Sequence, residues 1–270
     1  MGIAIVTAFF DIGRAEWGNR PNTPQWLARS TEDYFSCFER MCRLENELIV
    51  FTEPKFVQRI MDLRAKLGFA AQTKVVCKPD LFEEQGEAFR KIDAVMKKPG
   101  FLAGVTQPHC PEYWEPRYVL INYLKSVFAC EAIDAGLATS ALVAWLDFAY
   151  CRDDNVLPRT LKWDYPFSDK IHLFNIEQPD SQSLVSIIKT NKVYFTGCAI
   201  VAPQNQWREL KQLMQSAFNM LLSYDLMDDD QTLLLMSYRN APQLFETHFI
   251  EAAKSGWFVL FKHYNSFERH

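Results

Sequence analysis

A carboxylate at the end of an apolar run is the first residue in this sequence that is placed for chemistry. Leu142–Asp147 reads LVAWLD, and five apolar residues followed by polar ones are typical of a buried strand in an α/β sheet. The acid then lies at the carboxyl edge, where open α/β sheets bind ligands. Because a carboxylate there is costly without a metal ion, a cation or hydrogen-bond donors, we predict that Asp147 binds a metal or ligand.

A second acid follows the apolar stretch Ile3–Phe9, where Asp11 is followed by Arg14. The loop after a first strand is a common nucleotide site, and an arginine there suits a base or phosphate. The alternative is that Asp11 caps the turn and Arg14 pairs with Glu16. Neither a Gly-x-Gly-x-x-Gly motif nor a P-loop motif occurs, which argues against those two kinds of nucleotide site.

Three polar residues, Tyr118, Asn122 and Lys125, share one stripe of a predicted helix that leads into the Asp147 strand. If this stripe faces the same cleft, Lys125 suits a phosphate and Asn122 a sugar hydroxyl. The alternative is an ordinary solvated helix face.

Two further features lie in the second half of the chain. The cluster Asp228–Asp230 precedes Gln231 and either caps a helix or places one acid in an acceptor site, as a base or a hydroxyl-binding group. His263 follows the apolar run Trp257–Phe261. It is either a surface histidine or a second ligand to a divalent ion that a distant aspartate also binds.

Composition limits the class of protein. The 270 residues suit one sizeable domain or two small ones, and 49% hydrophobic residues exclude general disorder. The net charge of −4 provides no field for nucleic acid. Seven scattered cysteines without a zinc motif indicate reduced thiols in a cytosolic protein. No apolar run is long enough for a transmembrane segment, and the N-terminal apolar run is expected to be a core strand, not a signal peptide.

Strand-like and helix-like stretches alternate in the first half, which is typical of a mostly parallel sheet with right-handed crossovers. The expected strands are Ile3–Phe9, Leu48–Phe51 and Thr73–Cys77, and the expected helices are Thr31–Arg43 with a capping box at Ser30 and Asp33, Pro54 to Gly68, a stretch within Leu81–Lys97, and Arg117–Ala135 after an irregular connection.

The second half is less regular. We expect strands near Lys170–Phe174, Leu184–Ile188, Val193–Val201 and Trp257–Phe261, helices from Pro203 to Tyr224 and over Gln231–Tyr238, and an ordered irregular segment Cys151–Ser168. Neither a repeat nor a linker is evident, which favours one domain.

Five motifs together point to a known family: Val6–Arg14 (VTAFFDIGR), Phe51–Glu53 (FTE), Asn122 with Lys125, Trp145–Tyr150 (WLDFAY) and Asp229–Gln231 (DDQ). With them the chain resembles the HtrL/YibB family, bacterial proteins associated with lipopolysaccharide core gene clusters and related to GT-A glycosyltransferases. The motifs span nearly the whole chain, and the first and fourth are the most specific.

The resemblance implies a single GT-A-like domain over residues 1–270, with a Rossmann-type, mixed and mostly parallel sheet flanked by helices. Residues 1–150 would bind the nucleotide sugar and 151–270 the acceptor. The implied activity is transfer from a UDP-sugar to a glycan or lipid-linked glycan, such as a lipopolysaccharide core or O-antigen precursor. The implied location is cytoplasmic and compatible with peripheral attachment to the inner membrane.

The resemblance also implies roles for particular residues. Asp229 or Asp230 would be the base of an inverting transfer, and a retaining transfer would use that base less. The residues expected to bind the nucleotide sugar are Thr7, Phe9, Asp11, Arg14, Asn122, Lys125, Asp147, Gln231 and Lys262.

A metal is implied as well, because GT-A enzymes bind a divalent cation with an Asp-x-Asp motif. Here the motif is Asp147-Phe148-Ala149, so the second acid is absent. Mn²⁺ or Mg²⁺ would be held by Asp147, the donor diphosphate, waters and His263, and the imidazole would favour Mn²⁺.

Two other functions remain open. The missing acid suits a protein that binds nucleotide sugars without transferring them. A phosphohydrolase with Asp11 as nucleophile is a third reading, but it needs an acid two residues on, where Gly13 stands.

Overall fold

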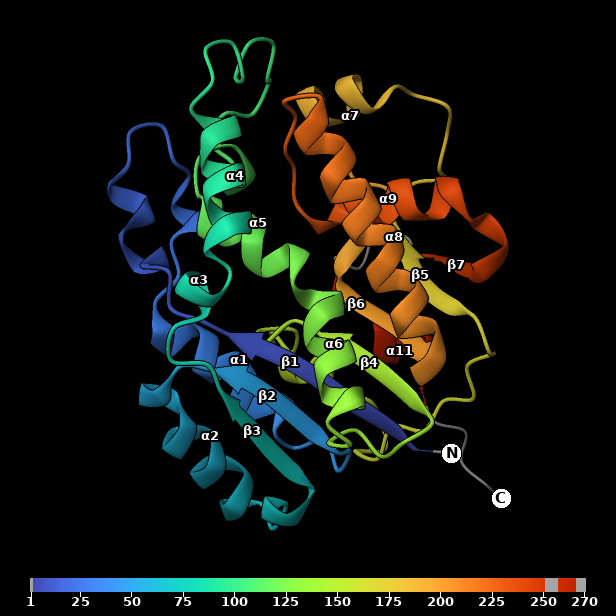
Figure 1. Ribbon diagram of the computed structural model, residues 1–270. Coiled ribbons are helices and arrows are strands. Elements are labelled where there is room, and N and C mark those ends of the chain that lie inside the picture. The colour runs from blue at the N-terminus through green and yellow to red at the C-terminus, as the bar shows by residue number, and fades with distance from the viewer. Residues whose placement is uncertain (1, 251–256, 266–270) are drawn as a thin grey trace.

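A single sheet forms the centre of the molecule. The computed structural model describes residues 2–250 and 257–265, and in this part seven strands are arranged in the order β3-β2-β1-β4-β6-β5-β7 (Figure 1). The strands are β1 Ile3–Phe9, β2 Leu48–Thr52, β3 Thr73–Cys77, β4 Leu142–Leu146, β5 Ile171–Asn175, β6 Phe195–Pro203 and β7 Phe245–Phe249. Among these strands β6 alone runs antiparallel to its neighbours. The predicted α/β fold with a mixed, mostly parallel sheet is confirmed.

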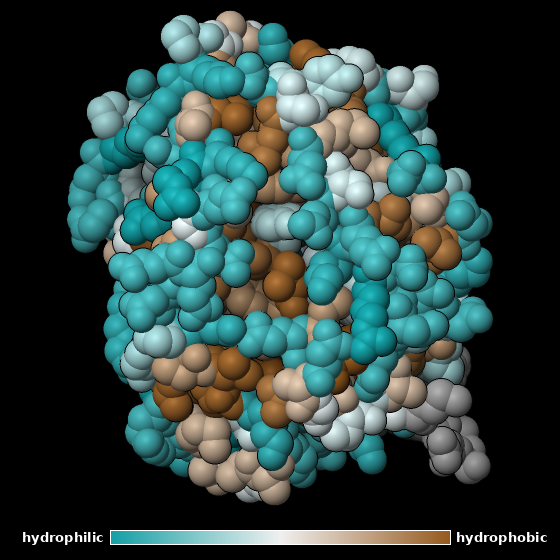
Figure 2. Space-filling model, viewed as in Figure 1, coloured by the Kyte–Doolittle hydropathy of each residue, from teal (hydrophilic) through white to brown (hydrophobic). Residues whose placement is uncertain are grey.

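Helices cover both faces of the sheet (Figure 1). Their bounds are α1 Thr31–Met41, α2 Pro54–Lys66, α3 Leu81–Glu84, α4 Gly86–Met96, α5 Pro116–Tyr123, α6 Lys125–Asp134, α7 Leu184–Thr190, α8 Gln204–Ser223, α9 Asp230–Asn240 and α11 Leu260–His263. Buried side chains of α1, α2 and α11 pack on one face, and those of α3 to α9 pack on the other. The face seen in Figure 2 is mostly hydrophilic, with apolar residues in a central hollow and in a second patch below it.

Strand β1 shows why the sheet needs both layers. Its seven residues are all buried, with Ala4 and Val6 in the core of one face and Ile3 and Ile5 in that of the other. Successive side chains of a strand point to opposite faces, so a continuous apolar run is expected where both faces are covered. At the carboxyl ends of these strands, Phe9 of β1 and Asp147 directly after β4 line a cavity.

Several predicted elements are confirmed with small changes. The capping box of α1 forms between Ser30 and Asp33, and Pro54 begins α2. The helix expected over Arg117–Ala135 is two helices, α5 and α6, that meet at Leu124. The stretch within Leu81–Lys97 is likewise divided, at Gln85.

Two strand predictions are wrong. Leu184–Ile188 belongs to helix α7, because the Ser183 side chain accepts a hydrogen bond from the Ser186 backbone and caps a helix that buries its isoleucines. Trp257–Phe261 is not a strand either, and Leu260–His263 forms the short helix α11. The edge strand β7 was not predicted, because only one of its five residues is fully buried.

The sheet includes strands from residues 1–150 and from residues 151–270.

All seven cysteines are free thiols, five of them buried. In the described residues we find no helix with the length and apolar character to cross a membrane.

Candidate active site

A cavity of about 440 Å³ lies at the carboxyl ends of β1 and β4. This is the edge at which open α/β sheets bind ligands, and the volume is in the range of small-molecule sites. Eight of the residues predicted from the sequence line it: Phe9, Asp11, Arg14, Asn122, Lys125, Asp147, Asp230 and Gln231.

Lys125, the first residue of α6, organises the floor of this cavity. Its ammonium nitrogen lies 2.8 Å from the Gly197 carbonyl oxygen, 2.8 Å from Asp230 Oδ2 and 3.0 Å from Asp147 Oδ1. An ammonium group has three protons, so these acceptors use all of them. Burial opposes the charge, but the two carboxylates outweigh it and raise the pKa of Lys125. Lys125 therefore stays charged and joins two acids that are far apart in the sequence.

Gly197 on β6 is required by the close approach of Asp230. A Cβ atom at this position would lie 1.9 Å from Asp230 Oδ2. Any other residue would therefore push the carboxylate away from Lys125. No local sequence pattern distinguishes this glycine.

Asp147, directly after β4, is held on one side and open on the other. Its Oδ1 accepts hydrogen bonds from Trp145 Nε1 at 2.9 Å and from Lys125, and its backbone NH donates to the Cys198 carbonyl. The side chain remains 39% exposed, and in the described part of the chain its Oδ2 has no partner. Ala149, in the second position of the motif, also lines the cavity. One carboxylate oxygen is thus available to a ligand.

The three consecutive acids at the start of α9 point in different directions. Asp228 accepts from the Thr232 hydroxyl at 2.7 Å, and Asp229 accepts from the Gln231 backbone NH and caps the helix. Asp230 lines the cavity, whereas Asp228 and Asp229 do not. Asp229 is thus the helix cap, whereas Asp230 is the acid of the cluster that lies in the cavity.

Burial raises the pKa of these acids and of a fourth one nearby, Glu112. Burial, then the charge of Asp228, raises the pKa of Glu112 to about 8. Burial raises the pKa of Asp228 to about 6. Burial also raises the pKa of Asp230, against the attraction of Lys125. A raised pKa brings a carboxylate closer to the range in which it accepts protons efficiently near neutral pH.

Three arginines, Arg14, Arg29 and Arg152, line the same cavity. Burial, followed by repulsion from Arg152 and Arg14, lowers the pKa of Arg29. Burial also lowers the pKa of Arg152. Guanidinium groups that repel one another in a cavity are stabilised by a bound anion, and a phosphate accepts their paired N–H donors.

Arg29 and Arg152 were not predicted, although sequence signals existed. Arg29 directly precedes the capping serine of α1, and Arg152 follows the WLDFAY motif. Arg152 Nε donates to the Ala149 carbonyl oxygen, and its guanidinium lies 4.2 Å from the centre of the Phe258 ring.

The loop after β1 is fixed by local hydrogen bonds. Asp11 Oδ1 accepts from the Gly13 backbone NH, as expected for a turn cap, and Gly13 has a positive φ of 73°. Arg14 does not pair with Glu16. Its guanidinium donates to the Leu27 carbonyl oxygen and to the Tyr34 hydroxyl. Arg14 is thus held at the cavity wall by its own neighbours.

Aromatic rings and an amide complete the walls. Trp26, Tyr34, Tyr118 and Phe258 line the cavity, and Trp26 is 61% exposed. Asn122 also lines it and donates to the Tyr118 carbonyl oxygen one helical turn away. Flat rings beside cationic groups suit a nucleotide base next to its phosphates.

Four predicted site residues do not line the cavity. Thr7 lies within β1 with no exposed surface, because both faces of that strand are covered. Asp229 is the N-cap of α9, and its side chain accepts a hydrogen bond from the Gln231 backbone NH. Lys262 and His263 are exposed on α11, because the expected strand there is a short helix. The structure therefore does not bring His263 together with Asp147.

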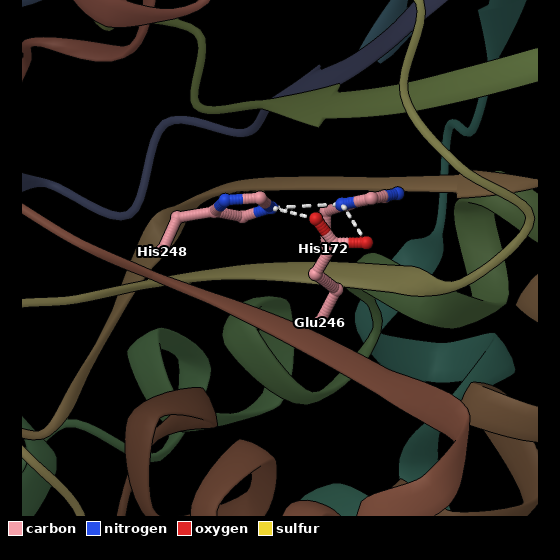
Figure 3. A group of neighbouring side chains, drawn as sticks. All are labelled: His172, Glu246 and His248. Atoms are coloured by element: carbon pink, nitrogen blue, oxygen red, sulfur yellow. Dashed lines mark hydrogen bonds and ion pairs between the residues drawn. The ribbon is translucent and has the colours of Figure 1, made fainter.

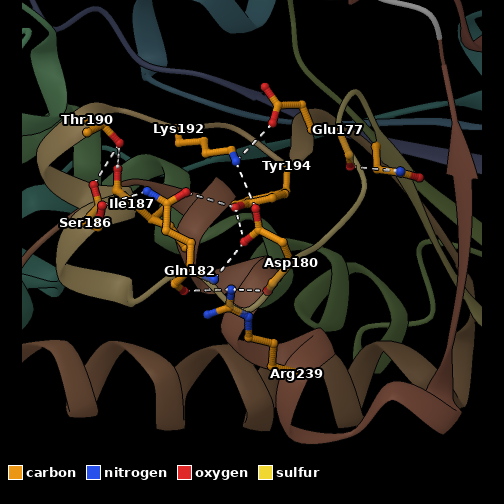
Figure 4. Close-up of polar contacts among 10 residues, drawn as sticks. Glu177, Asp180, Gln182, Ser186, Ile187, Thr190, Lys192, Tyr194 and Arg239 are labelled. Carbon is orange, nitrogen blue, oxygen red and sulfur yellow. Dashed lines mark hydrogen bonds and ion pairs between the residues drawn. The ribbon is translucent and has the colours of Figure 1, made fainter.

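A polar network away from the cavity holds α9, the helix that presents Asp230 (Figure 4). Arg239 on α9 donates to the carbonyl oxygens of Asp180 and Gln182 in the connection before α7. The Asp180 carboxylate accepts from the Tyr194 hydroxyl at 2.6 Å and from Lys192 at 3.0 Å. The two ends of α9 are thus anchored, one by this network and one by Asp230.

Comparisons with known proteins cover almost the whole chain. Residues 1–266 match the family described as "Bacterial protein of unknown function (HtrL_YibB)". Protein HtrL of Escherichia coli strain K12 is 36% identical over an alignment of 269 residues that covers 97% of this chain and 92% of that protein. Among solved structures, apo mouse xyloside xylosyltransferase 1 is similar with a TM-score of 0.44 and 12% identity, over 100% of this chain and 96% of that one.

Proposed function

Because the chain belongs to the HtrL/YibB family, we propose that it is a nucleotide-sugar-dependent glycosyltransferase that uses a UDP-sugar. The observation that carries the proposal is one cavity that combines three arginines, aromatic walls and the open carboxylate of Asp147. The arginines suit a diphosphate, the rings suit a base, and the acids suit sugar hydroxyls or a metal. The choice of glycosyl transfer as the reaction rests on the sequence resemblance to the HtrL/YibB family.

The arginines fit the charge that develops during transfer. The bond between the anomeric carbon and the diphosphate oxygen breaks, and the departing UDP gains negative charge. A new bond forms between that carbon and an acceptor oxygen, whose proton passes to a base. Cationic groups already positioned in a partly closed site lower the barrier to such a step. Arg14, Arg29 and Arg152 would do this at the diphosphate.

A divalent cation fits this site through a single protein ligand. Asp147 has one partnered and one open carboxylate oxygen, and Mg²⁺ or Mn²⁺ is often bound by one carboxylate together with substrate phosphates. Asp147 would hold the ion, which would neutralise diphosphate charge when bound. Ala149 leaves no second acid at the motif, so we assign most of the charge neutralisation to the arginines.

Lys125 takes a different role from the one expected. Its protons are already used by Gly197, Asp147 and Asp230, so it is a positioning residue and not a phosphate ligand. It fixes the distance between the donor side of the site at Asp147 and the acceptor side at Asp230.

Asp230 is our candidate for the group that meets the acceptor hydroxyl. It lines the cavity, and burial raises its pKa, which favours proton acceptance near neutral pH. We propose a glycan or lipid-linked glycan of the bacterial surface, such as a lipopolysaccharide core precursor, as the acceptor. This last choice rests on the family resemblance.

A second candidate function is nucleotide-sugar binding without transfer. Ala149 favours it, since a site with one metal-binding acid holds a diphosphate more easily than it activates one. The two functions share the binding step and differ in whether UDP is released from the sugar.

Thermal unfolding with nucleotides tests the shared step. UDP, GDP, ADP and NAD are added separately, with and without Mn²⁺, to the parent and to Asp147→Asn, which keeps the size of the side chain. A ligand at a hundredfold excess over its Kd stabilises by about 2.7 kcal/mol. We expect UDP with Mn²⁺ to raise the parent midpoint more than that of the variant. No shift with any nucleotide would overturn the proposal, and equal shifts would remove the role of Asp147.

A further inference from the structure

A second cluster of metal-binding side chains lies outside the cavity, at the edge of the sheet (Figure 3). His172 is on β5, and Glu246 and His248 are on the neighbouring strand β7. The parallel register pairs His172 with Glu246, so the three side chains emerge on the same face of the sheet. Their donor atoms all lie within 4.8 Å of one another.

The distances between these atoms are close to those of a shared ion. His172 Nδ1 lies 2.8 Å from His248 Nε2, and the two Glu246 oxygens lie 4.0 and 3.9 Å from these nitrogens. Two nitrogens that bind one tetrahedral zinc ion lie about 3.3 Å apart. The imidazoles would separate by about half an ångström, and the half-exposed Glu246 would move inward by a similar amount.

A further residue orients the buried imidazole. His172 Nε2 lies 3.2 Å from the Ser168 carbonyl oxygen, and the Ser168 hydroxyl donates to Glu246 Oε2 at 2.7 Å. With its proton on Nε2, His172 donates to that carbonyl and directs the Nδ1 lone pair toward His248. Histidines that bind metals usually donate their second ring N–H in this way.

The surroundings favour neutral imidazoles, the form that binds metals. His172 is 1% exposed, and the Phe167 and Tyr264 rings pack around the pair. Burial lowers the pKa of both histidines, that of His248 to about 4. The exposed carboxylate of Glu246 gives an ion a way in from solvent.

We propose that His172, Glu246 and His248 bind one transition-metal ion of the zinc type and thereby join the edge strand β7 to β5. Two imidazoles with a carboxylate suit Zn²⁺ better than Mg²⁺, which prefers oxygen ligands. The site is separate from Asp147 and does not depend on the proposed function. Its role would be to hold β7, which pairs with β5 alone among the described strands.

Zinc titration of the full chain tests the proposal. The protein is stripped with a chelator and titrated calorimetrically with Zn²⁺ alone. We expect one equivalent to bind to the parent and that equivalent to be lost in His248→Ala. His109→Ala, in the connection before α5, is the matched control and should keep it. Equal binding by the parent and His248→Ala, or no binding by the parent, would overturn the proposal.

Two measurements guard against misfolding and against binding to cysteine. Glu246→Gln changes a half-exposed side chain, so it should fold normally and bind Zn²⁺ at least tenfold more weakly. Parent-like affinity in this variant would remove Glu246 from the ligand set and contradict the proposed site. Co²⁺ in place of Zn²⁺ should give the visible absorption of a nitrogen and oxygen site. An intense thiolate charge-transfer band would place the ion on a cysteine and overturn the assignment.

Discussion

Lys125 and Asp230 form an ion pair in which the two side chains are only 4% and 2% exposed, with Nζ and Oδ2 2.8 Å apart. The pair joins the start of α6 to the start of α9 across 105 residues of sequence. Because Lys125 also contacts Asp147, one buried charge sets the relative position of both acids that we assign to the site.

Replacement of Lys125 by Met should be strongly destabilising. It leaves Asp230 buried without its cation, and loss of one partner of a buried pair costs about 3–5 kcal/mol. Lys91→Met is the matched control, because Lys91 pairs with Glu87 on an exposed helix face, where such pairs contribute about 0.3–0.5 kcal/mol. Chemical denaturation gives both values, and equal losses would show that the buried pair does not stabilise the fold.

Gly197→Ala should disturb the site through a single methyl group. The added Cβ would meet the Asp230 carboxylate, and overpacking of this kind costs about 1–3 kcal/mol. Gly86→Ala is the control, since its Cβ would meet only the end of the flexible Arg90 side chain. We expect a lower melting temperature for the first variant and no loss for the second. Unchanged stability and UDP binding in Gly197→Ala would contradict the close packing of Gly197 against Asp230.

Arg29→Gln should separate ligand binding from folding. Burial and its arginine neighbours disfavour the charge of Arg29, so its removal should leave the free energy of unfolding unchanged or slightly higher. UDP affinity should fall about tenfold to a hundredfold, since hydrogen bonds to charged groups contribute about 1.5–3 kcal/mol. Arg43→Gln, at a surface ion pair with Asp154, is the control. Calorimetric titration with UDP provides the comparison, and parent-like affinity in Arg29→Gln would exclude Arg29 from the site.

Stability should depend on pH through Glu112. Its pKa is about 8 in the folded protein and near its ordinary value of 4.5 when unfolded. Between these values the folded state keeps a proton that the unfolded state has lost, so the free energy of unfolding falls as pH rises, by up to about 1.4 kcal/mol per pH unit. The contribution of Glu112 to the free energy of unfolding is therefore fully present below pH 4.5 and lost by about pH 8.

Glu112→Gln should remove that dependence, because an amide does not titrate in this range. Calorimetric melting between pH 5 and 8.5 should show a smaller decline for this variant than for the parent. Glu209→Gln, on an exposed position of α8, should decline as the parent does. Parallel curves for the parent and Glu112→Gln would contradict the assigned protonation of Glu112.

The sheet was predictable where local patterns and burial agree. Apolar runs such as Ile3–Phe9 are buried on both sides, and the Ser30 capping box fixes the start of α1. The pattern failed for Leu184–Ile188, where β-branched residues favour a strand but the Ser183 cap and burial of one side favour a helix. It also failed for β7, whose pairing with β5 depends on a partner about 70 residues away in sequence.

The site was predictable where residues end a strand, and less so where distant segments meet. Asp147 follows directly from its apolar run. The role of Lys125 depends on Gly197 and Asp230, which no local pattern connects to it. His263 was expected to follow a strand, but Leu260–His263 is a helix. The side-chain direction expected at the end of a strand therefore does not hold for His263.

Release of UDP from UDP-sugars tests the central claim most directly, because slow hydrolysis by water needs no known acceptor. The parent, Asp147→Asn and Glu209→Gln are incubated with a panel of UDP-sugars and Mn²⁺, and UDP is measured. We predict release from at least one donor by the parent and Glu209→Gln, and a loss of about a hundredfold in Asp147→Asn, equivalent to about 2.7 kcal/mol. Absence of release from every donor, or equal release by the parent and Asp147→Asn, would contradict the account.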